Sequence, residues 1–425
     1  MAPSRAVVKI VLALLGVVPG ITVSLANLDV PPFVGLAVFG LAIWCAATLL
    51  GWAAETAELD ITGAFAMALL AIVAILPEYA VDVTLAFKAG TDQSYEALAS
   101  ANMNGATRLL IGLALPLVVL VGIRSRRRRA RRLAANPGTA NGQADPGGAD
   151  LGRRAFFDVL PIPAEHYSVM FFLVVAAALG CVAPLTEQVH AALGAVLIVV
   201  FAVFLWHTSR GEVGEPDLVG VSAFLGTQPK VRRRLLVIGF FAIAAGTIAV
   251  GAEPFVESLI ESGRALNVNE ALLIQWLAPL ASEAPEFIIA LTLAARHKAW
   301  AAVGMLLTSM VNQWAALVGS LPFAFKLGGG TWSLPLDARQ VEEFALTGSV
   351  TAVAVALLLS RRIPAWGAWF MLAVFAAEFA LPDEHARLVL AAVNGVAAAA
   401  LLVANARCLP ALFAEPFRRS GQSGE

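Results

Sequence analysis

The sequence predicts an all-α polytopic membrane protein with about twelve transmembrane helices, arranged as two inverted five-helix repeats plus one extra helix at each end. Of its 425 residues, 59% are hydrophobic and only 14% are charged, whereas soluble proteins contain about 25% charged residues. Apolar runs of about 18 or more residues, enough to cross a bilayer as a helix, recur along the chain. Two of these runs carry the same Pro-Glu dipeptide, which indicates two related halves.

Twelve runs meet this length criterion. The first could instead be a cleaved signal peptide, because Arg5 and Lys9 precede its apolar core and Ser24-Leu25-Ala26 resembles a cleavage site. A retained helix is the favoured interpretation, and the later spans have the same orientation in both cases. The expected limits are 6–26, 33–52, 62–87, 95–123, 167–185, 188–207, 233–252, 268–295, 299–325, 343–360, 363–381 and 386–406.

An arginine-rich block, residues 124–132, separates the fourth and fifth runs and is followed by a Gly- and Pro-containing tract at 136–148 that cannot bury a core. The block is interpreted as a cytoplasmic topology anchor, with lipid or regulator binding as the alternative. Counting spans from it places both termini in the cytoplasm, and the later positive clusters fall on the same side. We therefore expect a multi-pass protein of a bacterial inner membrane.

These features also set the expected domain limits. The first half comprises residues 31–123 and 167–207, with its repeat motif at about 62–123, and the second half comprises 233–381, with its motif at about 268–325. The remaining segments are an extra helix at 1–30, a basic linker at 124–166, a cytoplasmic loop at 208–232, and a last helix with its tail at 382–425.

The repeated motif places a proline and a glutamate inside an apolar run. It reads Ile-Leu-Pro77-Glu78-Tyr in the first half and Glu-Ala-Pro285-Glu286-Phe in the second. Proline removes a backbone donor and breaks a helix, and a carboxylate at mid-membrane costs about 2.5–3.5 kcal/mol. The two glutamates are 208 residues apart, and at the same spacing an asparagine follows each on the next span. Inverted repeats with broken helices are the architecture of secondary transporters with a mid-membrane site.

The polar residues around the two motifs are the expected cation ligands. Asp82 is four residues after Glu78 and Glu283 is three before Glu286, so each pair shares a helix face. Calcium would suit such carboxylate and amide oxygens, although sodium or protons could satisfy the same set. The expected cation-binding residues are Glu78, Glu286, Glu283, Asp82, Asn104, Asn312, Ser309 and Thr107, with Glu78 and Glu286 as the principal metal ligands.

Arg108 is the one cation expected near these carboxylates. A buried guanidinium needs a carboxylate partner, and Asp82 or Glu78 is the expected one. Arg108 is then either a built-in cation that occupies part of the site or a structural salt bridge. Glu253 and Glu378 lie near span ends, where solvated carboxylates are expected.

The Pro-Glu motifs and the Asn- or Gly-containing spans that follow them resemble the α-repeats of the sodium/calcium exchanger superfamily of calcium/cation antiporters, over residues 70–120 and 278–325. This resemblance implies two five-helix inverted halves, with Glu78 and Glu286 in the family's glutamate role. Ala74-Ile75 and Glu283 replace hydroxyl residues of the family pattern, and Gly105-Ala106-Thr107 replaces its Gly-Ser-Asn. The chain is therefore similar to a divergent branch with fewer hydroxyl ligands for sodium.

The expected function is secondary-active antiport of Ca²⁺, or a related cation, against Na⁺ or H⁺. Na⁺/H⁺ exchange on the same fold is the alternative, and a cation channel is the alternative from another class. Three separated cysteines and five histidines form no metal-binding pattern, and no intramembrane protease motif is present, so we expect neither a cofactor nor an enzyme. The net charge of −1 implies no nucleic-acid partner. The expected partners are the lipid bilayer and small inorganic cations, with the oligomeric state left open.

Overall fold

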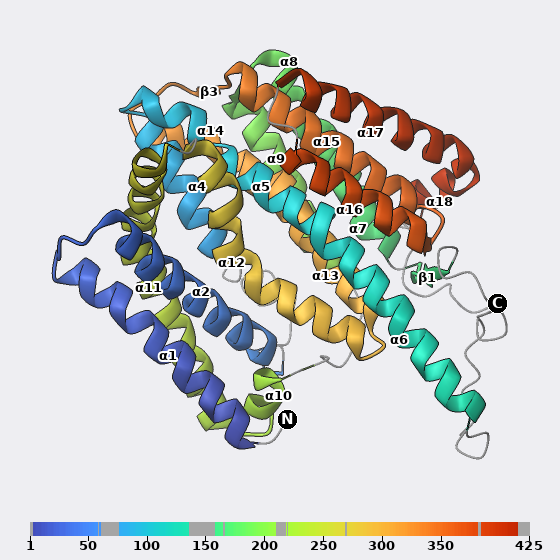
Figure 1. Cartoon of the computed structure of the whole chain (residues 1–425), viewed down its shortest axis with the longest axis horizontal. Coiled ribbons are helices and arrows are strands. Elements are labelled where there is room, and N and C mark those ends of the chain that lie inside the picture. Colours follow the sequence, from blue (N-terminus) through green and yellow to red (C-terminus); the bar gives the residue numbers. More distant parts are fainter. Residues whose placement is uncertain are drawn as a thin grey trace. The chain divides into compact units, whose positions relative to one another are not determined.

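The computed structural model describes residues 3–57, 59–60, 76–135, 158–164, 166–209, 218, 220–267, 270–380 and 384–414. These residues form an almost entirely helical protein with two short two-stranded antiparallel sheets (Figure 1). The all-α polytopic class predicted from the sequence is confirmed.

The helices follow the apolar runs, and short strands lie in the connections. The N-terminal elements are α1 (Pro3–Leu25), α2 (Pro32–Ala57), α4 (Leu76–Ala89), η1 (Gln93–Leu98), α5 (Ala101–Leu109), η2 (Leu110–Ala114), α6 (Leu115–Ala135), β1 (Val159–Pro161), α7 (His166–Gly180), α8 (Val182–Thr186), β2 (Gln188–His190) and α9 (Ala191–Thr208). The C-terminal elements are α10 (Val221–Gly226), α11 (Lys230–Leu266), α12 (Glu270–Ala295), α13 (Ala299–Asn312), η6 (Gln313–Leu317), α14 (Val318–Leu327), β3 (Ser333–Pro335), α15 (Ala338–Leu358), β4 (Arg362–Pro364), α16 (Ala365–Ala380), α17 (Glu384–Ala404), η7 (Ala406–Cys408) and α18 (Leu409–Ala414).

Within the described residues, nine helices are long and apolar enough to cross a membrane, and ten if the bent α12 counts as one span. The expected third span, 62–87, is described only from Leu76 onward. The expected eleventh corresponds to α16, whose apolar part, Ala365–Glu378, is shorter than a full span. The count of twelve therefore stays a prediction.

Two helices continue well beyond the limits expected for their spans. Helix α11 has 37 residues and continues past the expected end at 252, and α6 continues through the arginine block to Ala135. Apolar length indicates how much of a helix can lie in the bilayer, not where its hydrogen bonds end.

The described chain forms two compact units. The first contains residues 1–106, 179–286 and 312–344, and the second contains 107–178, 287–311 and 345–425. Each boundary falls inside a helix, because α5, α7, α12, α13 and α15 each contribute residues to both units.

Helix α4, which carries Glu78, is held in the first unit by its apolar face. Val81 and Leu85 are fully buried in a cluster that also contains Phe39 of α2 and Phe255 of α11. At the other end of α4, a Cβ added to Gly328 would lie 1.8 Å from the Phe87 carbonyl oxygen, so α4 and the end of α14 approach closely. This packing fixes the helix along its apolar face and near its C-terminal end.

In the second unit, β1 pairs with β4, and the segment before β4 is hydrogen-bonded to the start of α7. Val159 pairs with Pro364, and the Tyr167 hydroxyl donates a hydrogen bond to the Leu359 carbonyl oxygen over 2.8 Å. Gly112 lets α16 approach the helix that leads into α6, because an added Cβ would lie 2.6 Å from the ring of Phe375.

Among the described residues, each half of the chain contains one short π-helix after its glutamate and asparagine. These segments are η2, directly after α5, and η6, directly after α13. π-Helical turns are rare and occur frequently at functional sites. Asn104 and Asn312, which the sequence analysis names as expected ligands, lie on the helices α5 and α13 that directly precede these π-helices.

Candidate cation site

Three carboxylates converge in the first unit. Glu78 comes from α4, and Glu283 and Glu286 come from α12; one oxygen atom of each lies within 4.8 Å of the other two. Glu78 is 3% exposed and Glu283 is 0% exposed, while Glu286 is partly buried. No second cluster of histidine, cysteine, aspartate or glutamate side chains with this spacing occurs among the described residues.

The two prolines lie beside these glutamates. Pro77 is the second described residue of α4, directly before Glu78. Helix α12 bends by 58° between Leu272–Glu283 and Glu286–Ala295, at Pro285. A proline inside a helix produces such a bend because it removes one backbone bond and its ring meets the preceding turn. Glu283 thus ends one straight part of α12, and Glu286 begins the next.

Amides from the second half's polar interruption border the cluster. The Gln313 amide, at the start of η6, donates to Glu283 Oε1 over 2.5 Å. Its neighbour Asn312 accepts a hydrogen bond from the Tyr79 hydroxyl over 3.2 Å. Residues of both sequence halves therefore meet around the three glutamates.

Three oxygens at this place are buried, and no described residue donates a hydrogen bond to them. They are Glu78 Oε2, Glu283 Oε2 and Gln313 Oε1. Buried polar atoms are nearly always paired in folded proteins, so each exception needs an explanation. Carboxylate and amide oxygens are the ligands that hard cations prefer, so these oxygens are candidate ligands of a bound cation.

The charge of the cluster leads to the same inference. Carboxylates this close repel one another and cannot all stay ionised without compensation. A bound cation or bound protons can supply it, and the proton occupancy then belongs to the group rather than to one residue. The site chemistry therefore suits exchange between a metal ion and protons.

The structure places the other predicted ligands differently. Asp82 is fully buried but is not a member of the three-carboxylate cluster; its Oδ2 accepts a hydrogen bond from the Asn102 amide over 2.9 Å. The Asn104 amide donates to the Ser100 carbonyl oxygen of the turn before it, over 3.1 Å. Ser309 and Thr107 belong to the second unit.

Arg108 also belongs to the second unit, where Nη1 lies 3.4 Å from Glu378 Oε2. Both side chains are 2% exposed. The expectation that Glu378 is a solvated edge carboxylate is wrong, because the arginine that stabilises its charge comes from a helix 270 residues away in sequence. Glu253, in contrast, has a side chain 63% exposed and pairs with Lys88, as a surface carboxylate would.

A second group of buried polar residues lies in the first unit, and it was not predicted from the sequence. The Gln275 amide donates to Glu343 Oε2 over 2.8 Å, and Glu342 and Glu343 are both buried. Gly105 lies against the Gln275 backbone, where an added Cβ would be 1.6 Å from the carbonyl oxygen. The adjacent glutamates at the start of α15 are a signal in the sequence, but they fall at the limit of the span expected at 343–360, and the sequence analysis assigns them no role.

A family profile matches most of the chain. The profile of the family described as sodium/calcium exchanger protein matches residues 31–210 and 236–381. The chain belongs to the sodium/calcium exchanger family. It therefore belongs to a family of transporters, and the resemblance seen in its Pro-Glu repeats is confirmed.

Solved structures of exchangers share the fold. A crystal structure of the H⁺/Ca²⁺ exchanger CAX matches with a TM-score of 0.85 and 30% identity, covering 97% of this chain and 98% of that one. The sodium-calcium exchanger NCX_Mj matches with a TM-score of 0.51 and 16% identity, covering 84% and 100%; at that identity the likeness shows the fold alone. A comparison with curated protein sequences returned no match.

Proposed function

We propose that this member of the exchanger family is an antiporter that moves Ca²⁺ across the membrane in exchange for H⁺, with Glu78, Glu283 and Glu286 as the shared binding site. The observation that carries the proposal is the convergence of these three carboxylates, two of them buried, within 4.8 Å. The cations are the transported substrate rather than a cofactor, and no enzymatic reaction is proposed.

Calcium suits the donor set. It takes about six to eight oxygens in flexible geometry, often from bidentate carboxylates and amides. Glu78, Glu283 and Glu286 offer carboxylates, and the Gln313 carbonyl oxygen is buried beside Glu283. A divalent ion also removes most of the repulsion that the three charges would otherwise produce.

Protons are favoured over sodium as the counter-ion because the described residues offer few hydroxyl oxygens beside the three carboxylates. The Ser282 hydroxyl donates within its own helix, to the carbonyl oxygens of Ala278 and Pro279, a common habit of helical hydroxyls. Protons need no such shell, since they bind the carboxylates directly. The likeness to the H⁺/Ca²⁺ exchanger CAX, at 30% identity over nearly the whole chain, supports the same choice.

In the proposed cycle, calcium and protons compete for one site that opens to each side in turn. Calcium binding releases protons from the carboxylates, and protonation releases calcium on the other side. In either state the cluster is largely neutralised, which lowers the cost of carrying it through the bilayer interior. The two inverted halves, and the cytoplasmic location of both termini, are further parts of this proposal.

The test is calcium uptake into proteoliposomes containing the purified full-length chain, driven separately by a proton gradient and by a sodium gradient. We expect saturable uptake with the proton gradient. Glu78→Gln, Glu283→Gln and Glu286→Gln should each reduce uptake at least about 100-fold, since each removes a charged ligand of the bound ion, worth several kcal/mol. Glu253→Gln, an exposed carboxylate outside the cluster, is the matched control and should transport normally.

Several results would contradict the proposal. Normal proton-driven uptake in a folded Glu78→Gln or Glu286→Gln protein would remove the site. Uptake driven only by sodium would keep the site but replace the counter-ion. A linear calcium conductance that needs no counter-ion would instead indicate a channel.

A further inference from the structure

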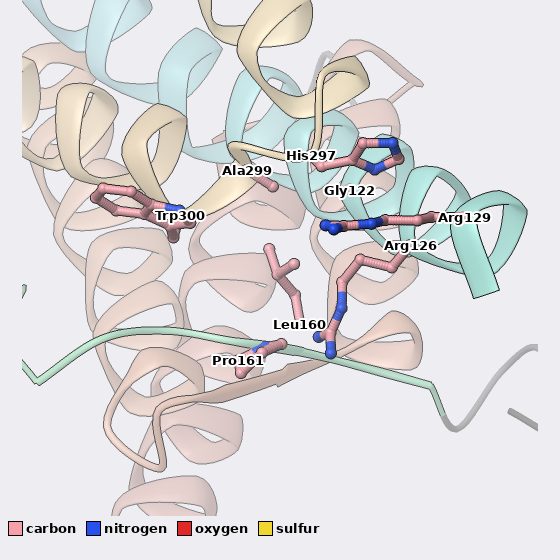
Figure 2. A pocket seen from close by; sticks show the side chains of 8 residues that line it. All are labelled: Gly122, Arg126, Arg129, Leu160, Pro161, His297, Ala299 and Trp300. Carbon is pink, nitrogen blue, oxygen red and sulfur yellow. The ribbon is translucent and has the colours of Figure 1, made fainter. Parts of the chain in front are cut away.

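A pocket in the second unit has a strongly basic lining. It is formed by α6, by β1, and by the turn and first residues that lead into α13 (Figure 2). Its volume is about 210 Å³. Pockets for drug-sized ligands have volumes of about 300–1,000 Å³, so this one suits a small ion or headgroup rather than a nucleotide. The lining residues are Gly122, Arg126, Arg129, Leu160, Pro161, His297, Ala299 and Trp300.

Two arginines of the 124–132 block line the pocket because of their helical spacing. Gly122, Arg126 and Arg129 are spaced by four and three residues, so they occupy one face of α6. Gly122 lets α13 approach that face, since an added Cβ would lie 2.5 Å from the Ala299 side chain. The neighbouring Arg124 and Arg128 are exposed and do not line the pocket.

The acidic residue directly before β1 forms an ion pair with an arginine outside the lining. Asp158 precedes the strand and forms an ion pair with Arg127, which lies outside the lining. The described residues of the lining contribute two guanidinium groups and one imidazole, and none of them is a carboxylate. Its field therefore attracts an anion.

His297 presents a ring nitrogen to the same space. It holds a left-handed φ of 68° in the short turn between α12 and α13. The Ser125 hydroxyl donates to the Ala295 carbonyl oxygen over 3.0 Å, so it accepts from His297 Nδ1 over 2.6 Å. The ring is thereby oriented, and Figure 2 shows it above the side chain of Arg129, with Arg126 below.

The pocket lies where α6 changes from apolar to basic. Leu115 to Ile123 are nearly all apolar, and arginines begin at residue 124. Trp300, 41% exposed, and Leu160 provide an apolar side, and exposed tryptophans are typical of the membrane–water interface. Basic pockets between transmembrane helices at such a level accept lipid headgroups.

We propose that this pocket binds a phosphate group, held by Arg126 and Arg129, either as the headgroup of an anionic lipid or as a free ion. Guanidinium groups pair with phosphate oxygens in a bidentate manner. The site is distinct from the three-carboxylate cluster and does not depend on which ions are exchanged there.

The test compares three forms of the full-length protein in neutral detergent: wild type, Arg126→Gln/Arg129→Gln, and Arg124→Gln/Arg128→Gln. The last has the same charge change on the same helix outside the pocket. Binding of short-chain phosphatidylglycerol, and of phosphatidylcholine with identical chains, is measured by native mass spectrometry. Inorganic phosphate is then added as a competitor, and unfolding temperatures verify that all three forms fold.

We expect wild type to prefer phosphatidylglycerol and the pocket variant to bind it about thirtyfold more weakly, corresponding to about 1 kcal/mol for each arginine. The Arg124→Gln/Arg128→Gln control should lose less than about threefold, because its arginines meet the anion only through solvent. Competition by millimolar phosphate assigns the pocket to a soluble ion, and its absence assigns it to the lipid. Equal losses in both variants, no loss in the pocket variant, or no preference in wild type would overturn the proposal.

Discussion

Arg108 and Glu378 form a buried ion pair between residues that are distant in sequence. Removing one member of such a pair leaves an uncompensated charge, which costs about 3–5 kcal/mol. We therefore expect Glu378→Gln to lower the stability of the protein by this amount, measured by thermal unfolding in detergent. Glu253→Gln, at an exposed position, should change it by less than about 0.5 kcal/mol.

Replacing both members distinguishes a structural pair from a charge that function requires. Arg108→Met/Glu378→Leu removes both buried charges, so it should recover much of the stability lost by Glu378→Gln. Normal calcium uptake by the double variant would identify the pair as structural. Restored stability with abolished uptake would identify the arginine as part of transport.

Asp60 lies outside the membrane spans, and its ion pair with Arg233 makes the stability of the protein depend on pH. Its carboxylate accepts hydrogen bonds from Arg233 over 2.6 and 2.9 Å, and these bonds lower the pKa of Asp60 below its usual range. A lowered pKa in the folded state adds stability above the unfolded value of about 3.9 and loses it as the pH falls through the folded value. The difference in unfolding temperature between wild type and Asp60→Asn should thus be constant from pH 5 to 8 and shrink below about pH 4. A difference that grows on acidification would refute this.

At this scale, sequence reasoning identifies Glu78, Glu283 and Glu286 because a carboxylate in an apolar run is costly and the pattern occurs twice. It misjudges Glu378, because a buried acid near the end of a span has the same local sequence as a solvated one. Its partner, Arg108, is 270 residues away. Asp82 shares the expected helix face with Glu78, yet Asn102 engages it. Spacing along one helix does not show what the facing helix contributes.

Among the helices, the contact between α5 and α12 permits the least change. An added Cβ at Gly105 would lie 1.6 Å from the Gln275 carbonyl oxygen, and a backbone atom cannot rotate away. We expect Gly105→Ala to separate the two helices, to cost at least about 1–3 kcal/mol of stability and to abolish calcium uptake. Thermal unfolding and proteoliposome uptake measure the two effects.

The control is a glycine in open space. A Cβ at Gly239 of α11 would have no described atom within 4 Å, and alanine is favoured over glycine in a helix by about 0.5–1 kcal/mol. Gly239→Ala should therefore be neutral or stabilising and should transport normally. Equal effects of the two substitutions would mean that the close approach of α5 and α12 is not important.

The positions of most helices could be predicted from apolar length, but their ends could not. Helix α11 and helix α6 both continue into charged segments, because a helix that leaves the bilayer keeps its own backbone hydrogen bonds. The bend of α12 falls at Pro285, where a break was expected, since proline acts locally. The close contacts at Gly105 and Gly328 depend on the opposing backbone and leave no local pattern.

For the whole molecule, a ligand that binds only the folded state raises its stability by mass action. Calcium at about 100 times its dissociation constant should therefore stabilise the protein by about 2.7 kcal/mol. We expect calcium to raise the unfolding temperature of wild type and of Glu253→Gln. It should not raise the unfolding temperature of Glu283→Gln. Magnesium should act more weakly because it demands a compact octahedral shell. An equal shift in Glu283→Gln would place calcium elsewhere.

The all-α membrane class could be predicted because composition acts over the whole chain, and the organisation in two inverted halves stays a prediction. The division into two compact units could not, since every boundary falls inside a continuous helix. No change of composition marks those points. Packing between helices distant in sequence decides them.

The π-helical turns η2 and η6 have one more consequence. In such a turn the backbone hydrogen bonds join residues five apart instead of four, so the residues after it face a different direction from those of an uninterrupted α-helix. The register of α6 relative to α5 is therefore set by the length of Leu110–Ala114. Because Arg126 and Arg129 follow that segment on the same helix, gaining or losing one amino acid there would change the direction in which both guanidinium groups point.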